Sequence, residues 1–263
     1  MPIPLSEMVI PLSADQIRSY HEQGFLIIRD VIARGAIADA AAEIARLAER
    51  TDLIDVNNIR CRFWKQVDSD DCRFDCFDPI IDLSSRSRAL AHDPRILGIA
   101  SALYGEPACL LKDKLIFKPP GAQGYALHQD YIAWPSFPTS FLTIIVAIDP
   151  CHAENGATEV FPGFHHQGYL SPRDGQYHEL PVDAVAQGKG VVLELQPGDI
   201  AVLSGYTPHR SAPNRSASTR RQLYVSYNAI SDGGEQRRAH YDEFHLWLKD
   251  KYAEHGKTNT YFR

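Results

Sequence analysis

Residues 108–118, ACLLKDKLIFK, mark the point at which the character of this 263-residue chain changes. From here to about residue 230, apolar and β-branched runs alternate with Gly, Pro and Asn turns, as in SFLTIIVAI (140–148) and RQLYVSYNAI (221–230). No helical pattern interrupts these runs. Short, closely spaced strands are typical of antiparallel sheets, so the sequence predicts a mainly β fold, a two-sheet jelly roll or barrel, with flanking helices.

Helical signals dominate the chain before residue 108. Ser13 is placed as an N-cap with Gln16 as its capping-box partner, and Gly24 ends the segment, which predicts a short helix. Further predicted elements are a strand over 25–32, helices over 35–50 and 92–105, and a last helix over 237–256 that packs outside the roll. We therefore predict one domain, made of a mostly helical buttress (1–107), a jelly-roll core (108–230) and a C-terminal helical part (231–263).

The composition argues against several classes of protein. Hydrophobic residues make up 44% of the chain and charged residues 23%, which is typical of globular proteins. The formal charge of −6 argues against a nucleic-acid or anionic-membrane binder. No apolar run reaches the roughly 18 to 20 residues of a membrane span, and the first residues do not resemble a signal peptide, so we expect a cytoplasmic protein. The five cysteines are odd in number and lack tight CxxC spacing, which favours reduced thiols.

A histidine and an aspartate stand two apart in GYALHQDYIAWPSF (124–137), inside an apolar and aromatic run. In a strand, residues i and i+2 point to the same face, so His128 and Asp130 are expected to aim inward while Gln129 points away. A buried carboxylate needs a charged partner, and a metal ion would supply one. His209, just after another predicted strand, is the expected third ligand. Two imidazoles and one carboxylate are the set favoured by non-haem Fe(II). Taken alone, His128 is better explained as an ordinary hydrogen-bonded histidine, and only the joint pattern favours a metal ligand.

Arg220 lies eleven residues beyond His209, at the start of the next predicted strand. Neighbouring antiparallel strands bring such a pair to the same mouth of the roll, and a guanidinium binds a carboxylate through two parallel hydrogen bonds. Arg220 therefore fits the far carboxylate of 2-oxoglutarate. Arg221 competes for this role, because strand alternation sends one of the two outward, and an ordinary surface arginine is the alternative interpretation.

Several of these stretches together resemble the phytanoyl-CoA dioxygenase family of Fe(II)- and 2-oxoglutarate-dependent oxygenases. They are HQD (128–130), ENGATEVFPGFHHQG (154–168), PGDIAVLSGYTPHRSAPN (197–214) and LSADQIRSYHEQGFLIIRDVI (12–32). The resemblance implies a cupin-like double-stranded β-helix that uses Fe(II), 2-oxoglutarate and O2.

The same resemblance implies roles for individual residues. The implied iron ligands are His128, Asp130 and His209, with Arg220 as the salt-bridge partner of 2-oxoglutarate. Ser211 and Thr143 would contact that cosubstrate.

The strand before HQD departs from the relatives considered. Ectoine hydroxylase carries amide side chains there to hold the keto-acid end of 2-oxoglutarate, whereas alternation here puts Lys112, Lys114, Ile116 and Lys118 on one face. We expect these lysines to bind an anionic group of the cosubstrate or the substrate. The alternative is the solvated face of an edge strand.

Two further groups are candidates for substrate binding. Tyr131, Trp134 and Phe137 follow the strand that is expected to carry His128. They are interpreted either as part of the core or as a substrate wall that faces an alkylammonium group. Asn58 and Arg60 lie in a predicted loop between helices that would reach over the pocket. A salt-bridged surface turn is the alternative for that loop.

The expected substrate is a small polar molecule. KDKLIFKPPG (112–121), SYNAISDGGEQR (226–237) and YAEHGKTNTYFR (252–263) resemble the branch of the family that acts on aminoethylphosphonates. This implies hydroxylation of 2-aminoethylphosphonate, or its N-methylated analogue, at the carbon next to phosphorus. Alternatives are the same chemistry on an amino acid, an ectoine-like osmolyte or an acyl-CoA, and a non-catalytic jelly-roll binding module. We expect no nucleic-acid or membrane partner, and a homo-oligomer is left open.

Overall fold

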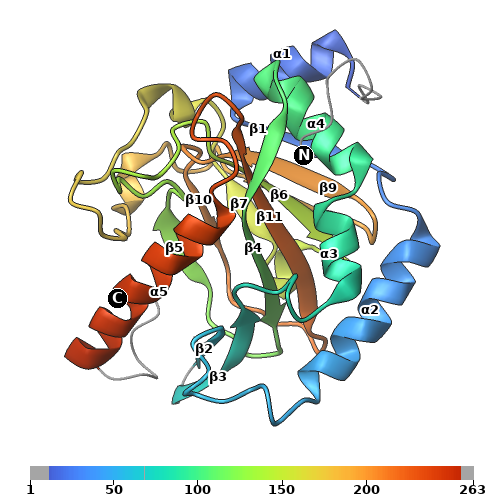
Figure 1. Cartoon of the computed structure of the whole chain (residues 1–263), viewed down its shortest axis with the longest axis vertical. Coiled ribbons are helices and arrows are strands. Elements are labelled where there is room, and N and C mark those ends of the chain that lie inside the picture. Colours follow the sequence, from blue (N-terminus) through green and yellow to red (C-terminus); the bar gives the residue numbers. More distant parts are fainter. Residues whose placement is uncertain (1–11, 68, 256–263) are drawn as a thin grey trace.

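Two antiparallel β-sheets dominate the computed structural model, which describes residues 12–67 and 69–255 (Figure 1). Among these residues the larger sheet has seven strands in the order β1-β9-β6-β11-β4-β3-β2, and the smaller sheet has four in the order β5-β10-β7-β8. The strands are β1 (Phe25–Ile28), β2 (Cys61–Gln66), β3 (Ser69–Phe77), β4 (Ala108–Lys118), β5 (Tyr125–His128), β6 (Leu142–Ala147), β7 (Thr158–Val160), β8 (Val191–Val192), β9 (Ile200–Ser204), β10 (His209–Ser211) and β11 (Arg220–Ala229). The two sheets form a double-stranded β-helix, so the predicted jelly roll is confirmed.

The helices of the first part of the chain lie along the larger sheet (Figure 1). They are α1 (Ala14–Gln23), α2 (Arg34–Ala48), α3 (Ser85–Ala91) and α4 (Pro94–Tyr104). The start of α1 is set by the predicted capping box, in which the Ser13 hydroxyl accepts from the Gln16 amide and the Gln16 side chain accepts from Ser13 N. Gly24, with φ 80°, ends the helix in the left-handed region. The prediction for this helix is therefore confirmed.

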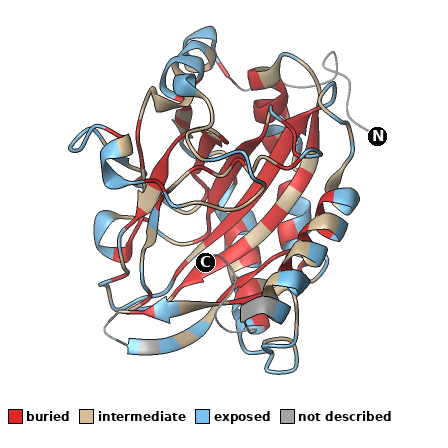
Figure 2. Ribbon diagram, turned by 90° about the vertical axis from the view of Figure 1, so that its left-hand side faces the viewer, coloured by how far each residue is buried: buried red, intermediate tan, exposed pale blue. Residues whose placement is uncertain are grey.

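Strand alternation gives the larger sheet two different faces. Leu115, Leu223 and Val225 belong to the large apolar cluster that also contains Ile44 of α2 and Ile99 of α4. Figure 2 shows these strands as buried ribbons with partly exposed helices outside them. Because neighbours along a strand point to opposite faces, the residues between these apolar ones face the smaller sheet.

The sheet is built around the β4–β11 pair, which runs antiparallel from Arg220 opposite Lys118 to Ala229 opposite Ala108. β4 lies between β11 and β3, so the interpretation of its lysine face as part of an edge strand is wrong. β4 is an inner strand because of a hairpin that the sequence did not reveal. The chain directly after Asn58 and Arg60, expected to be a loop, forms β2, which pairs with β3, and β3 then pairs with β4. Charged residues interrupt the apolar alternation of β2 and hid it.

The C-terminal helix α5 (Arg237–His255) does more than cover the outside of the roll. Its residues Tyr241, Phe244 and Leu248 pack with Trp134 and Phe141 in a second apolar cluster. Short 3-10 helices are η2 (Ala153–Asn155), η3 (Phe164–Gln167) and η4 (Val182–Ala184). Most of the terminal motif YAEHGKTNTYFR lies outside the described residues.

Two expectations about the chain as a whole can be compared with the structure. The cysteines Cys61, Cys72, Cys76, Cys109 and Cys151 are all unpaired, as expected. In the described part of the chain, none of the helices combines the length and the apolar character needed to span a membrane.

Candidate active site

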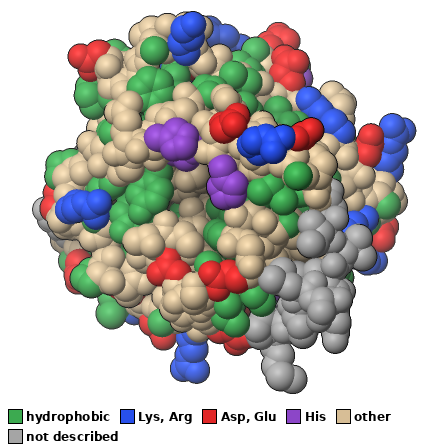
Figure 3. All heavy atoms as spheres, turned by 90° about the horizontal axis from the view of Figure 1, so that it is seen from above, with side chains coloured by type: hydrophobic (Ala, Val, Ile, Leu, Met, Phe, Trp, Pro, Cys, Tyr) green, Lys and Arg blue, Asp and Glu red, His purple; other side chains and the backbone are tan. Residues whose placement is uncertain are grey.

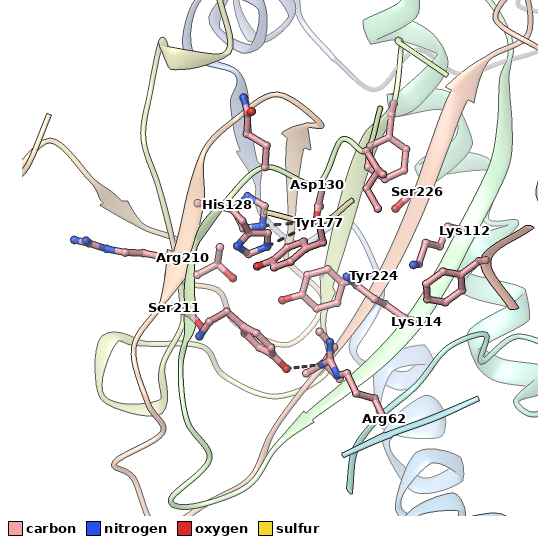
Figure 4. A pocket seen from close by; sticks show the side chains of 18 of the residues that line it. Arg62, Lys112, Lys114, His128, Asp130, Tyr177, Arg210, Ser211, Tyr224 and Ser226 are labelled. Atoms are coloured by element: carbon pink, nitrogen blue, oxygen red, sulfur yellow. Dashed lines mark hydrogen bonds and ion pairs between the residues drawn. The ribbon is translucent and has the colours of Figure 1, made fainter. Parts of the chain in front are cut away.

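A cavity lies between the two sheets, and strands of both contribute to its wall (Figure 4). The residues that line it are Arg62, Trp64, Lys112, Lys114, Ile116, Tyr125, His128, Gln129, Asp130, Ile132, Trp134, Phe137, Phe141, Thr158, Tyr177, His209, Arg210, Ser211, Arg220, Tyr224, Ser226, His240 and Phe244. Asp130 is the only carboxylate among these lining residues. The wall therefore combines aromatic faces with several cations and one acid.

His128, Asp130 and His209 converge in this cavity. One ligand atom from each lies within 4.8 Å of the others. Nε2 of His128 is 4.0 Å from Oδ1 of Asp130, and Nε2 of His209 is 3.8 Å from the same oxygen. The two histidines face each other because β5 and β10 pair antiparallel with His128 opposite His209. Sheet register thus brings together residues that are far apart in sequence.

The backbone selects the nitrogen that each histidine presents. Nδ1 of His128 donates to the Ala126 carbonyl at 2.7 Å, and Nδ1 of His209 donates to the Thr207 carbonyl at 3.0 Å. Because a carbonyl only accepts, Nδ1 carries the proton and Nε2 keeps its lone pair. This bracing is typical of metal-ligating histidines. Burial, followed by the neighbouring His209, lowers the pKa of His128 to about 3, so the ring is neutral and able to ligate.

Asp130 reaches the site in a different way from the one predicted. β5 ends at His128, so the aspartate lies on the segment that follows and not on the strand. Gln129 braces that segment, because its amide donates to the carbonyls of Gly168 and Tyr206 and accepts from Leu170 N. The i and i+2 argument was therefore wrong in detail, although the two side chains do meet.

The environment of Asp130 favours its charged form. Burial by itself would raise the pKa of this carboxyl, but His209, Lys114 and His128 lower it, as does the hydrogen bond from Thr143. Oγ1 of Thr143 donates to Oδ2 of Asp130 at 3.2 Å, which leaves Oδ1 directed at the two imidazoles. Two neutral imidazoles and one carboxylate, each held by a further hydrogen bond, fit a divalent iron ion.

Arg220 lies deep in the same cavity with 1% of its surface exposed. One terminal nitrogen donates to the carbonyl of Gly156, and Nε has no hydrogen-bond partner among the described residues. A buried guanidinium with an unused donor fits a carboxylate ligand. Arg221 points the other way, where it forms hydrogen bonds of 2.7 Å to both carboxylate oxygens of Asp149. The structure therefore separates the two arginines as strand alternation predicted.

Ser211 and Lys118 complete this end of the cavity. Nζ of Lys118 donates to Oγ of Ser211 at 2.8 Å, to the Gly156 carbonyl at 3.2 Å, and to the Ala212 carbonyl. Gly156 has φ 70°, and a Cβ there would collide with the Ala212 carbonyl and with Nζ of Lys118. Glycine is thus required where one backbone carbonyl accepts hydrogen bonds from both Lys118 and Arg220.

The remaining residues predicted to bind the cosubstrate are Thr143, Lys112 and Lys114. Thr143 is 2% exposed, does not line the cavity and donates a hydrogen bond to Asp130, so its contact with the cosubstrate stays a prediction. Lys112 and Lys114 do line the cavity, as the alternation of β4 predicted. Nζ of Lys112 is 3.1 Å from Oδ2 of the fully buried Asp78, which makes a solvated strand face the wrong interpretation.

The predicted substrate residues divide into two groups. Trp134 lines the cavity, whereas Tyr131 packs behind it against Phe137 and Tyr206.

Asn58 and Arg60 do not line the cavity, so their prediction as substrate-binding residues is not supported by their position. Asn58 donates to the Leu53 carbonyl, and Arg60 pairs with Asp82 at 3.1 Å on the surface. This segment is therefore a surface turn with a salt bridge, which was the alternative interpretation of the sequence.

Sequence reasoning missed Arg62, two residues further along. Arg62 is 2% exposed, pairs with Asp75 at 2.6 Å, and also donates to the Tyr125 hydroxyl, which in turn donates to Asp75. The alternation of β2 is the signal that could have found it, because Arg62 and Trp64 share the face toward the cavity. Tyr177, whose ring centroid lies 5.5 Å from that of His128, comes from a long irregular segment and had no sequence signal.

Comparison with known proteins points to one family. The family described as phytanoyl-CoA dioxygenase (PhyH) matches residues 20–222. A methylphosphonate hydroxylase of Gimesia maris is 37% identical over 147 residues, which cover 56% of this chain and 55% of that protein. A 2-aminoethylphosphonate dioxygenase of uncultured bacterium HF130_AEPn_1 is 34% identical over 164 residues, which cover 62% of this chain and 60% of that protein. The aligned part thus spans less than two thirds of either relative.

Solved structures share the fold. A crystal structure of the epimerase SnoN in complex with Fe3+, alpha ketoglutarate and nogalamycin RO superposes with a TM-score of 0.69 at 22% identity. The match covers 82% of this chain and 83% of SnoN.

Proposed function

The chain belongs to the phytanoyl-CoA dioxygenase family, and we propose that it is an Fe(II)- and 2-oxoglutarate-dependent dioxygenase that hydroxylates a small organophosphonate. The observation that carries this proposal is one cavity that contains both the His128, Asp130 and His209 donors and the buried Arg220 guanidinium. A metal-binding jelly roll without turnover would not need the buried Arg220 guanidinium. We also propose that the described core and helices form a single domain.

His128, Asp130 and His209 would hold Fe(II) on one face and leave its other positions open. When bound, iron and 2-oxoglutarate supply the oxidising chemistry, in which O2 is consumed and the cosubstrate loses CO2 to become succinate. The protein contributes binding and orientation. The Nδ1 hydrogen bonds of the two histidines fix the ring planes, and Thr143 fixes the carboxylate of Asp130.

Arg220 would bind the far carboxylate of 2-oxoglutarate, with Ser211 beside it. Because Arg220 is buried, the charge-assisted hydrogen bonds that it makes are strengthened. Lys118 holds the Ser211 hydroxyl and shares the Gly156 carbonyl with Arg220, so it maintains the shape of this end.

The proposed substrate is 2-aminoethylphosphonate or its N-methylated analogue, hydroxylated at the carbon next to phosphorus. Two relatives that act on phosphonates, at 37% and 34% identity, support this choice. The cavity also carries lysines for an anionic group, and the faces of Trp134, Phe137 and Phe244 for an alkylammonium group. Methylphosphonate is a second candidate, because the relative from Gimesia maris is named for it.

Other substrates have less support. An acyl-CoA would need a broad basic surface for its phosphates. On the face shown in Figure 3, the Lys and Arg side chains of the described residues lie scattered among acidic and apolar ones. An amino acid or an ectoine-like osmolyte would fit the cavity chemistry without explaining its lysines.

The test is succinate formation by the Fe(II)-loaded protein with 2-oxoglutarate and O2. Candidates are 2-aminoethylphosphonate, its N-trimethyl analogue, methylphosphonate and an acyl-CoA ester. We expect a phosphonate to stimulate succinate formation strongly and to yield a 1-hydroxyphosphonate detectable by phosphorus NMR. The variant His209→Ala is the negative control. If no phosphonate stimulates more than ethanolamine does, the substrate assignment is wrong.

A further inference from the structure

The cavity wall carries an unusual number of cations for a site with one carboxylate. Five cationic side chains line it, namely Arg62, Lys112, Lys114, Arg210 and Arg220. Burying a cation is costly unless an opposite charge compensates it, so each one requires a partner from the protein or from a ligand.

Three of the five have carboxylate partners within the protein. Arg62 pairs with Asp75 at 2.6 Å, and both side chains are almost fully buried. Lys112 pairs with Asp78 at 3.1 Å. Arg210 pairs with Glu159 at 2.6 Å, and Figure 4 shows its side chain directed away from the centre of the cavity. These three cations are compensated before any ligand binds.

Lys114 and Arg220 are the remaining two. Neither forms an ion pair with any carboxylate in the described residues 12–67 and 69–255. Lys114 is half-buried, and its Nζ lies 5.2 Å from the centroid of the Tyr224 ring. Asp130 is the one acid in the wall, and its charge is needed by a metal ion. The protein therefore leaves two cationic positions for two anionic groups.

The two positions are separated along the same strand pair. Arg220 stands opposite Lys118 in the β4–β11 register, and Lys114 stands opposite Tyr224, four residues further along. Four residues of strand span roughly 13 Å, and the Tyr224 ring lies beside the Lys114 ammonium. In Figure 4, Lys112 and Lys114 lie on one side of the metal-binding residues, and Ser211, which marks the Arg220 end, lies on the other.

We propose that Lys114 binds the anionic headgroup of the substrate, at the end of the cavity opposite the cosubstrate carboxylate bound by Arg220. This inference rests on the proposed function, and it removes the ambiguity over which ligand the β4 lysines serve. For an organophosphonate the headgroup is the phosphonate itself. Lys112 keeps its pair with Asp78 and packs over the Phe244 ring, 4.2 Å from the centroid, so it positions the aromatic wall rather than binding the anion.

The assignment predicts that methylphosphonate and 2-aminoethylphosphonate bind to this cavity with similar affinity. The phosphonate is the group they share, and the wall offers no carboxylate apart from Asp130 to pair with an ammonium. Any amine would then contact the aromatic faces, which attract alkylammonium groups weakly. Most of the binding free energy should come from the headgroup.

The decisive experiment compares Lys114→Met with Lys189→Met, which removes an exposed lysine that does not line the cavity. Calorimetry under anaerobic conditions, with Fe(II) present, measures the Kd of 2-oxoglutarate, and then the Kd of methylphosphonate and 2-aminoethylphosphonate in the presence of 2-oxoglutarate. We expect Lys114→Met to raise the Kd of both phosphonates about 10- to 100-fold, because a charge-assisted hydrogen bond is lost. The Kd of 2-oxoglutarate should change less than about threefold, since Arg220 is intact. Lys189→Met should match the wild type for every ligand.

Other results would overturn the proposal. If Lys114→Met weakens 2-oxoglutarate and phosphonates equally, or 2-oxoglutarate alone, the lysine serves the cosubstrate. Should Lys114→Met fail to fold by circular dichroism, Lys114→Gln replaces it, with the same expected and contradicting results.

Failure of the substrate assignment gives a different pattern. In that case the wild type binds 2-oxoglutarate but neither phosphonate, and a panel of sulfonate and carboxylate anions is titrated instead. Loss of binding to one of these in Lys114→Met supports the lysine as the headgroup site for another substrate. If the wild type and Lys114→Met bind all these anions equally, the proposal that Lys114 binds the headgroup is refuted.

Discussion

The two ends of the cavity lie along the β4–β11 strand pair and are built differently. At one end, Arg220 and Lys118 are 1% and 2% exposed, and both donate to the backbone carbonyl of Gly156. At the other end, Lys114 is half-buried above an aromatic ring. Backbone carbonyls cannot be altered by point substitution, whereas aromatic and lysine side chains can. The buried end at Arg220, the closed end, suits a ligand common to a family. The partly exposed end at Lys114, the open end, suits a ligand that varies among the family's members.

The proposed metal ligands His128, Asp130 and His209 lie between these ends. Replacing Asp130 by Ala should therefore have the largest effect, because it removes a ligand and the negative charge near Lys114 together. We expect a fall in Fe(II) affinity of more than about 100-fold, and a comparable loss of turnover. Equilibrium dialysis with Fe(II) under anaerobic conditions measures the affinity. Unchanged affinity would show that the three residues are not a metal site.

The closed end is tested by Arg220→Met, which has nearly the same length but no charge. The KM for 2-oxoglutarate should rise about 10- to 100-fold, because the carboxylate loses its charge-assisted hydrogen bonds. The Kd of the phosphonate, measured at saturating 2-oxoglutarate, should change little. A larger effect on the phosphonate than on 2-oxoglutarate would exchange the assigned roles of the two ends. Arg221→Met is the matched control, since Arg221 pairs with Asp149 outside the cavity.

Lys118 allows a test of the closed end by pH. Burial, followed by the nearby Arg220, lowers the pKa of Lys118 to about 6 in the folded protein, against 10.5 for an unperturbed lysine. Between these values the unfolded state binds more protons than the folded state, so this group makes stability rise with pH and opposes folding most strongly below about pH 6. Lys118→Met removes this contribution. Its free energy of unfolding relative to the wild type should therefore fall by up to about 2 to 3 kcal/mol from pH 6 to pH 8.

Urea unfolding of both proteins across this pH range measures the difference. Parallel stability curves for Lys118→Met and the wild type would show that the lysine does not titrate there.

The smallest effect is expected outside the cavity, at Arg60. This residue pairs with Asp82 at 3.1 Å, and about a third of its side chain is exposed. Arg60→Ala should change stability by less than about 1 kcal/mol and leave the KM of the substrate within twofold. By contrast, Arg62→Met leaves Asp75 buried without its partner and should cost about 3 to 5 kcal/mol. A substrate KM that rises severalfold in Arg60→Ala would restore the predicted role of this loop.

Much of the fold follows from local sequence patterns. The capping box at Ser13 and the left-handed Gly24 are set by neighbouring residues, so they could be predicted with their positions. The strands after residue 108 were found for the same reason, because alternation is visible in a short window. The β2–β3 hairpin was missed, since its buried positions include Arg62 and Asp75, whose burial depends on the ion pair that they form across the hairpin.

The residues of the candidate site likewise include some that the sequence indicated and some whose position it did not indicate. Spacing and residue type selected His128, Asp130, His209 and Arg220 as candidates, and the structure brings all four to one cavity. They gave no sign that Thr143, assigned by the resemblance to the cosubstrate, donates a hydrogen bond to Asp130.

The sequence by itself determined the periodicity of the strands and the identity of the groups able to bind a metal and an anion. The tertiary structure alone decided which cations remain uncompensated. Lys112 meets Asp78, and Arg62 meets Asp75, whereas Lys114 meets an aromatic ring. The physical reason is that an ion pair depends on a distance of a few ångströms between groups from different strands. Such distances are set by sheet register and packing, and no pattern within a single strand encodes them.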